Sequence, residues 1–419
     1  MKNEIKDIES YILEFITHKK PPKDTLLKYR QYTNKNNNFN KISSIKNLKD
    51  LNQIKYFFIS DRPNYFFLRL ALELKKKRIK TVLISRWGPF NYEKKFFSKI
   101  FLYDHFEDLK LLSNLQNKVF YIQQWPGYNF LPLYCKHIFN KNNKLICNIN
   151  DLTKITYKNI EVYTKGNYLK DEIKKDIKYE KKVLETFNFI THFYKDHKIF
   201  NKYSNKIKKK IRNFKIIYFP CYPCRSFFYT KKRILNPKKI HLVYIGNCPT
   251  SSKGNSDTFL DKTIDRITKN KIKLTYLNNP QNYYKKNNYV LNELSKDNAY
   301  FNFKKGFLPW ELKSISQVFT FGIMPFYFSN NYSPELMKGP ISTKIFTYIE
   351  QGLPIIVTNK MRSISDFVNY YKVGIVLNNI KDIKNIKNLI INSDYDQLTK
   401  NVINYRNQFS INKQLDEIF

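Results

Sequence analysis

Cysteine and histidine are scarce in this chain of 419 residues. Five cysteines are too few for the disulfide framework of a chain this long, and they fit reduced thiols in a cytosol. Cys221 and Cys224 have the spacing of a zinc or redox pair, but no second such pair exists and the six histidines show no paired ligand spacing. We therefore interpret these two residues as a pair of loop cysteines.

Long apolar runs are also missing. No stretch reaches the roughly 18 apolar residues that a helix needs to cross a bilayer. The N-terminus mixes charges among its apolar side chains and lacks the uninterrupted apolar segment of a secretory signal. We expect a cytoplasmic protein, with any membrane contact peripheral and at the inner face.

Acidic residues are few as well: 34 Asp and Glu stand against 75 Lys and Arg, which gives a formal net charge of +41. Such an excess can indicate nucleic-acid binding, because phosphates require cations along one face. Only 11 of the basic residues are arginine, and Asn, Ile, Tyr and Phe are abundant, as expected if an AT-rich genome spreads lysine everywhere. Runs such as 75–78 and 206–212 then indicate solvated helix faces, and no nucleic-acid partner is expected.

The apolar residues that are present fall into two α/β halves. In each half, continuous apolar runs of the kind required by a sheet covered on both faces alternate with helical patterns. The runs that predict strands are 54–60, 81–85, 118–124 and 144–150 in the first half, and 241–246, 271–277, 317–326, 353–358 and 373–377 in the second.

Changes of pattern predict the domain boundaries. A helix at 180–196 closes the first half, and the segment 215–239 is rich in proline and basic residues without a clear period, as suits an interdomain crossing. The predicted parts are a helical lead (1–48), a first Rossmann-like domain (49–213), a linker (214–240), a second Rossmann-like domain (241–395) and a C-terminal helix that crosses back (396–419).

Glycine is rare but unevenly placed. Seven of the ten glycines lie in the second half, mostly at or near predicted strand ends. This placement indicates turns that need a positive φ, or a close approach of the backbone to a ligand. These glycines are Gly246, Gly254, Gly306, Gly322, Gly339, Gly352 and Gly374.

The stretch 342–359, STKIFTYIEQGLPIIVTN, combines a capped helix start with a buried strand. Ser342 and Thr343 open the helix, and Gly352 ends it where a left-handed C-cap is needed. Small residues, hydroxyls and Lys344 gather around the helix start, where free N–H groups and the positive end of the macrodipole favour an anion. The sequence therefore predicts an anion site that a diphosphate would fit.

This stretch, followed by SDFV at 365–368 and KVGIV at 372–376, resembles the donor-binding part of GT-B glycosyltransferases of the family 4 and family 1-like group. There a pattern close to P-x-K-x-F-E-Y-x-A-x-G-x-P-V-I precedes a strand and a short G-I-V segment. The match in order and spacing runs from about Gly306 to Leu377. The resemblance implies the GT-B fold: an N-terminal acceptor domain and a C-terminal nucleotide-sugar donor domain, both Rossmann-like, that face each other across a cleft.

Residue by residue, the resemblance implies that Ser342 and Thr343 present hydroxyls and amides to the donor diphosphate, with Lys344 neutralising its charge. The family commonly has a Glu that grips the donor ribose five residues before the helix-ending glycine, and here that position is Thr347. Glu350 lies close to one turn later, and it either substitutes for that Glu or is an exposed helix charge.

A looser resemblance concerns the turn after the strand at 241–246. Gly246 and Asn247, with Lys253, are similar to the glycine turn and basic pair of the retaining branch, whose cations hold the donor phosphate. Asn247 stands where that branch usually has Arg, so only Lys253 keeps the charge. The alternative for Lys253 is a mobile Ser-rich loop.

Residues after first-half strands are predicted to edge the acceptor cleft, because the carboxyl ends of parallel strands meet at one edge. An inverting reaction needs a general base there, whereas a retaining reaction does not, and both remain open. Asp61, His105 and Asp151 are candidate bases, each with a turn or capping role as its alternative. Arg62 and Trp125 complete the predicted acceptor edge.

Together these features predict a hexosyltransferase that moves a sugar from a nucleotide diphosphate to a glycan or lipid-linked acceptor, in surface polysaccharide or glycolipid assembly. We expect no metal or other cofactor, since no convincing D-x-D loop is present. Catalysis would rest on Lys344, Lys253 and Asp151. The alternatives are a nucleotide-sugar epimerase on the same fold, a non-catalytic partner subunit, and a basic nucleic-acid-binding protein.

Overall fold

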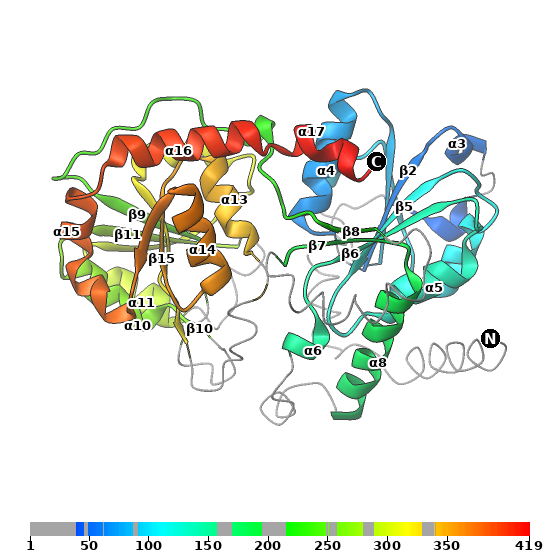
Figure 1. The fold of residues 1–419 in the computed structure, drawn as a ribbon, viewed down its shortest axis with the longest axis horizontal. Helices are drawn as coiled ribbons and strands as arrows, with labels where there is room; N and C mark the ends of the chain where they lie inside the picture. The colour runs from blue at the N-terminus through cyan, green and yellow to red at the C-terminus, as the bar shows by residue number, and fades with distance from the viewer. Residues whose placement is uncertain are drawn as a thin grey trace.

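Two α/β domains lie side by side in the computed structural model, the N-terminal one blue to green and the C-terminal one largely yellow to red (Figure 1). The structure describes residues 39–45, 49–61, 63–86, 91–156, 170–194, 215–248, 250, 258–279, 289–328, 339 and 341–419.

The N-terminal domain is built on an eight-stranded parallel sheet of order β1-β4-β3-β2-β5-β6-β7-β8. Its strands are β1 (Asn40–Lys41), β2 (Tyr56–Ser60), β3 (Thr81–Ser85), β4 (Lys99–Leu102), β5 (Val119–Gln124), β6 (Lys144–Ile149), β7 (Phe189–His192) and β8 (Lys215–Tyr218). Its helices are α3 (Lys49–Asn52), α4 (Tyr65–Lys76), α5 (Phe130–Ile138), α6 (Thr153–Thr156) and α8 (Lys170–Thr186).

The C-terminal domain has a six-stranded parallel sheet of order β12-β11-β9-β13-β15-β16 and a separate antiparallel β10-β14 pair. The strands are β9 (His241–Gly246), β10 (Thr258–Phe259), β11 (Lys273–Asn278), β12 (Phe301–Lys305), β13 (Phe321–Met324), β14 (Tyr327–Phe328), β15 (Ile355–Thr358) and β16 (Gly374–Leu377). The helices are α10 (Asp261–Thr268), α11 (Tyr289–Asp297), α13 (Thr343–Glu350), α14 (Arg362–Tyr371), α15 (Ile386–Ile391), α16 (Tyr395–Gln408) and α17 (Ile411–Gln414).

Strand β2 shows why the apolar runs are continuous. Successive side chains point to opposite faces of a sheet, and both faces of this sheet are covered. Tyr56 and Phe58 belong to the apolar cluster that includes α4, whereas Phe57 and Ile59 belong to the cluster that includes α5. All five residues of β2 are therefore buried.

Four local predictions are wrong. The predicted helix 180–196 ends at Thr186, and its aromatic and β-branched continuation forms β7. Part of the predicted linker, residues 215–218, is instead edge strand β8, and the described end of the predicted helical lead contains edge strand β1. The predicted strand 317–326 begins only at Phe321, because the residues before it form a short 3-10 helix. Edge strands carry weak apolar patterns, since one side lacks a partner strand.

The chain crosses between the domains twice, once through residues 219–240 and once after α16. Helix α16 lies along the C-terminal domain, and α17 and the C-terminus reach the N-terminal domain beside α4 (Figure 1). The Ile411 amide donates to the Pro223 carbonyl at 2.9 Å, and the Phe419 ring packs edge-on at 5.0 Å from the Tyr56 ring. Within the described ranges, no helix combines the length and apolarity needed to span a membrane.

A buried ion pair joins α4 to α13 across the domain boundary. Arg69 Nε lies 2.8 Å from Glu350 Oε1, and Arg69 Nη2 lies 2.7 Å from Oε2. The two side chains are 1% and 0% exposed, so water cannot solvate either charge if its partner is removed. The Cys224 amide donates a further hydrogen bond to Glu350 Oε1 at 2.8 Å.

We predict that Arg69→Met lowers the free energy of unfolding by about 3 to 5 kcal/mol, because it leaves a buried carboxylate unpaired. The double variant Arg69→Met/Glu350→Met should recover part of that loss. Urea denaturation measures both. Lys181→Met, which breaks an exposed pair with Glu185, is the control and should cost less than about 1 kcal/mol. A loss in Arg69→Met no larger than the control's would contradict the prediction.

Candidate functional site

Helix α13 begins and ends where the sequence predicts. Ser342 is the N-cap, with extended backbone angles, and its hydroxyl accepts from the Lys344 amide at 3.4 Å. At the other end Gly352 has φ +66°, the left-handed conformation that stops the helix before β15. At the helix start, Ser342 and Lys344 are half-buried and Thr343 is exposed.

The two predicted donor-binding segments meet at Gly246 and Lys344. Gly246 ends the central strand β9 with φ +119°, and a Cβ added there would lie 2.6 Å from Lys344 Cε. The missing side chain thus leaves the space in which the lysine lies. The ammonium group is 5.9 Å from the centre of the Tyr244 ring, which supplies a favourable π-face.

Lys344 carries a charge that the described residues around it do not neutralise. Burial lowers its pKa, which indicates that the charged form is poorly solvated. In the part of the chain that the structure describes, no carboxylate forms an ion pair with it. The N–H groups at the start of α13 add partial positive charge at the same place. An anion bound here would relieve both.

The start of α13 lies against the N-terminal domain. The Ile341 amide donates to the Phe193 carbonyl at 3.1 Å, immediately after β7. The helix start is therefore shared between the two domains rather than enclosed in one.

Thr347 and Glu350 face Arg69 rather than the helix start. The Thr347 hydroxyl accepts from Arg69 Nη2 at 3.4 Å and donates to the Thr343 carbonyl. Both carboxylate oxygens of Glu350 accept from Arg69, which leaves none directed to a donor ribose. The alternative expectation for Glu350, an exposed helix charge, is wrong, because its exposed fraction is 0%.

The other residues predicted for the donor side contribute less. Asn247 is exposed, and its carbonyl accepts from the Tyr244 hydroxyl at 2.6 Å. Lys253, like Arg62 on the acceptor side, lies outside the described residues.

The cysteines are buried thiols. Cys224 donates to Glu73 Oε1 at 3.1 Å, and burial raises the pKa of Cys221 to about 11. Within the described ranges, no three His, Cys, Asp or Glu side chains gather as a metal site would require.

The candidate bases lie at very different distances from the start of α13. Their strands end at one edge of the sheet, and neighbouring strands are about 4.8 Å apart. Asp151 follows β6, next to β7, whereas His105 follows β4, five strands from β7 or roughly 24 Å. His105 is exposed and its amide donates to Asp108 in a helix cap, as its alternative interpretation expects. Asp61 follows β2 and lies 3.8 Å from Arg86 Nη1.

Asp151 has the electrostatic character of a base. It is half-buried, and burial raises its pKa to about 6. At neutral pH it is mostly ionised, and it binds protons far more readily than an exposed aspartate. Its neighbour Asn150 fixes the strand ends: it donates to the Gln124 carbonyl at 2.8 Å and accepts from Asn64 at 3.0 Å.

Two acidic residues that the sequence reasoning missed hold the loops beside Asp151. Asp176 of α8 accepts from the Gly127 amide at 2.7 Å and from the Thr153 hydroxyl at 2.6 Å. Glu180, one turn later, accepts from the Thr153 and Lys154 amides. The loop with half-buried Trp125 after β5 and the loop after β6 are therefore fixed to α8. The sequence did hold a signal for these two acids: they lie on the same face of α8 as the buried Ile173 and Val183, where an acid is unusual.

Glu180 should make stability depend on pH. Burial, and then neighbouring Asp176, raise its pKa to about 8 from an ordinary 4.5. Between these values the folded protein keeps a proton that the unfolded chain releases, so stability falls as pH rises through this window. At about 1.4 kcal/mol per pKa unit, the decline amounts to a few kcal/mol.

We predict that Glu180→Gln, which stays neutral, removes most of this decline in the free energy of unfolding, measured by denaturation at pH 5, 7 and 9. Glu185→Gln on the same helix, where the Glu185 side chain is 40% exposed, should keep the wild-type decline, and equal slopes in the two variants would exclude the assignment.

Comparisons with known proteins agree with this architecture. Residues 267–413, which contain α13, match the family model "Glucosyltransferase 3-like, C-terminal domain". No curated protein matches the chain.

Solved structures match nearly the whole chain. A glycosyltransferase from Rickettsia africae ESF-5 is 14% identical, with 87% of this chain and 96% of that one covered and a TM-score of 0.52. An alpha-glucosyltransferase in complex with UDP-glucose and DNA containing an abasic site is 11% identical, with 86% and 98% covered and a TM-score of 0.51. At such identities the likeness concerns the fold. The chain has the GT-B glycosyltransferase fold, with two Rossmann-like domains.

Proposed function

We propose that this protein is a glycosyltransferase that moves a hexosyl group from a nucleotide-diphosphate donor to a glycan or lipid-linked acceptor. The observation that carries the proposal is the meeting of Lys344 with Gly246 at the start of α13. Two segments far apart in sequence bring together a cation, a strand that ends in a glycine, and a helix N-terminus. Among the described residues, no carboxylate pairs with that cation. That combination suits a diphosphate.

Cleavage of a nucleotide-sugar bond leaves additional negative charge on the departing diphosphate. The ammonium of Lys344 and the N–H groups of α13 would stabilise that charge, more strongly in the leaving group than in the intact donor. Because these groups are held by the fold before the donor binds, they need little reorganisation. We propose that no metal ion is required for this step.

The acceptor would bind against the N-terminal domain, next to the loops that α8 fixes. Asp151 is the best placed of the candidate bases, one strand from the Phe193 carbonyl that holds the α13 start. If the reaction inverts the anomeric centre, Asp151 takes the acceptor hydroxyl's proton. Trp125, on the neighbouring loop, offers a ring for stacking on a sugar.

The five buried cysteine thiols suit a reducing compartment, and we propose a cytoplasmic enzyme. Contact with the inner membrane face and a role in surface polysaccharide assembly remain predictions of the sequence. The hexosyl identity of the transferred sugar is likewise a prediction from the sequence.

Donor binding tests the role of Lys344. Lys344→Met should raise the Kd for UDP or GDP, measured by calorimetry, by about 10- to 100-fold, since a charge-assisted contact contributes about 1.5 to 3 kcal/mol. Gly246→Ala should weaken binding too, because a Cβ displaces the lysine. Without nucleotide, Lys344→Met should be no less stable than wild type, because it removes a partly buried charge that no described carboxylate pairs with. Exposed Lys384→Met is the control, and equal affinities in the two lysine variants would refute the assignment.

The pH profile tests Asp151. With the pKa of Asp151 at about 6, the carboxylate is lost below that pH, so kcat/KM for sugar transfer should fall about fivefold as pH drops from 6 to 5 and approach unit slope below pH 5. Asp151→Asn should be slower by about 10²- to 10⁴-fold and lack this dependence. Donor binding, measured separately, should be unchanged. Wild-type rates in Asp151→Asn would mean that Asp151 is not a base and would favour a retaining reaction.

A further inference from the structure

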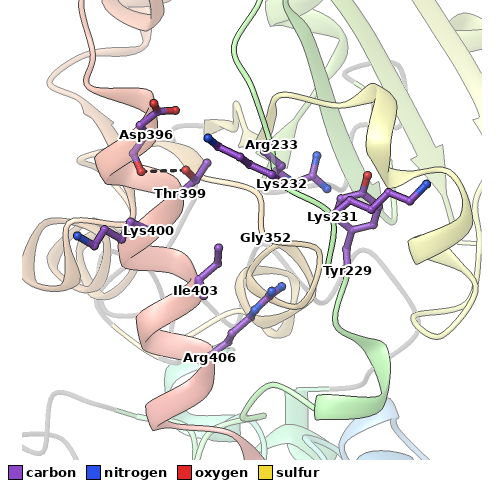
Figure 2. A pocket seen from close by; sticks show the side chains of 10 residues that line it. All are labelled: Tyr229, Lys231, Lys232, Arg233, Gly352, Asp396, Thr399, Lys400, Ile403 and Arg406. Atoms are coloured by element: carbon purple, nitrogen blue, oxygen red, sulfur yellow. Dashed lines mark hydrogen bonds between the residues drawn. The ribbon is translucent and has the colours of Figure 1, made fainter.

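A cavity of about 270 Å³ lies in the C-terminal domain, at the end of α13 opposite the proposed donor site. It is bounded by α16 on one side and by the segment 229–233 on the other, as Figure 2 shows. Five basic side chains line it, with Asp396 the only acid among its described lining residues. The five are Lys231, Lys232, Arg233, Lys400 and Arg406.

Two of these cations are buried beside each other. Arg233 is 8% exposed and Arg406 is 5% exposed. Their guanidinium groups stack on consecutive rings, Arg233 at 4.5 Å from the Tyr229 centre and Arg406 at 4.7 Å from the Phe228 centre. Burial lowers the pKa of Arg233 to about 10, and burial together with the neighbouring Arg233 charge lowers the pKa of Arg406 to about 10. Both groups therefore stay charged at neutral pH. Neither pairs with a carboxylate in the described part of the chain.

Helix capping explains one of the two arginines. Arg233 donates to the Gln351 carbonyl through Nε and Nη2, and to the Ser316 and Phe319 carbonyls through Nη1. A cation at a helix C-terminus with several carbonyl acceptors is stable without an anion. Arg233 alone would therefore indicate no ligand.

Arg406 is different. Its Nη1 donates to the Glu350 carbonyl at 3.0 Å, but its Nε is buried with no hydrogen-bond partner among the described residues. Native proteins rarely leave a buried charged donor unsatisfied, and each such group needs an explanation. Figure 2 places the Arg406 guanidinium at the cavity, near Gly352. A Cβ at Gly352 would lie 3.4 Å from Arg406 Nη1 and 3.6 Å from Arg233 Nε, so both guanidinium groups lie beside this glycine at the end of α13.

The geometry points to an anion site in this cavity that takes a phosphate group, carried by a small phosphate ester or by a lipid headgroup. A dianion would neutralise the two buried guanidinium charges. Arg406 would offer its planar fork to the phosphate oxygens, whereas Arg233, whose nitrogens already donate to carbonyls, would contribute its charge. The exposed ammonium groups of Lys232 and Lys400 at the rim would attract it. This site does not depend on the proposed function, because it lies about 12 Å away, the length of α13.

The occupant would lie against the C-terminal end of α13, which packs against the other domain. Arg406 and Arg233 hold the Glu350 and Gln351 carbonyls, and the Glu350 side chain pairs with Arg69 of the other domain. A phosphate in the cavity would thus contact Arg406, which binds the backbone of Glu350, the residue whose side chain forms the interdomain ion pair.

Calorimetric titration with pyrophosphate and with inorganic phosphate, at constant ionic strength, tests the site. Every protein carries Lys344→Met, so that the proposed donor site does not contribute. Ile403→Glu places a carboxylate three residues before Arg406, within reach on the same helix, and should raise the Kd at least tenfold. Leu389→Glu is the matched control, because Leu389 and Ile403 are both 39% exposed and only Ile403 lines the cavity. Its Kd should stay within twofold of the parent's.

A second pair of variants avoids any change in folding. Lys232→Met/Lys400→Met removes two exposed lining charges, and Lys381→Met/Lys384→Met removes two exposed charges elsewhere. Only the first should weaken phosphate binding, by at least threefold. Equal binding in the two double variants, or in Ile403→Glu and Leu389→Glu, would overturn the proposal.

Vesicle sedimentation distinguishes the two phosphate sources. Phosphatidylglycerol vesicles that bind the parent and Leu389→Glu but not Ile403→Glu, while free phosphate binds weakly, identify a headgroup. Binding of phosphate or pyrophosphate without vesicle binding identifies a small phosphate ester. A parent that binds neither phosphate, pyrophosphate nor vesicles excludes the site.

Discussion

The ion pair between Arg69 and Glu350 lies where neither charge can reach water, and it sets α4 of one domain against α13 of the other. A buried charge must be paired, and here each domain supplies one partner. The pair fixes the flank of α13, and the contact from Ile341 to Phe193 fixes its start. The positions of the proposed donor and acceptor groups follow from these two contacts.

Helix α13 has chemically different ends, and the fold treats each according to its charge. At the positive end, the Lys344 side chain lies at the helix start and beside Gly246, which ends its strand, and this arrangement suits an anion. At the negative end, Arg233 and Arg406 bind the last carbonyls, as the macrodipole favours. Arg406 caps the helix with one nitrogen, and its buried Nε has no hydrogen-bond partner among the described residues, which is why we propose a ligand here.

The acceptor side depends on buried polar groups of another kind. Asp176 and Glu180 project from α8 into the space beneath two loops, where backbone amides of Gly127 and Thr153 need acceptors. Burial raises the pKa of Glu180, so the network works with a neutral carboxyl group at pH 7. The loops that carry Trp125 and Asp151 are therefore held by a rigid helix, which suits groups that must be placed accurately.

Local pattern alone determined the class of fold and the limits of α13. Strands buried on both faces need continuous apolar runs, and a Ser cap and a left-handed glycine act within a few residues of the helix ends, so both signals are legible in the sequence. Edge strands β1 and β8 were missed because only one side of each is paired.

Tertiary structure alone decided which charges meet. Glu350 looked like either a ribose ligand or a surface charge until Arg69, far away in the sequence, was brought against it. Lys344 reached Gly246, and Arg406 reached Arg233, in the same way, since burial and pairing depend on which segments the fold packs together.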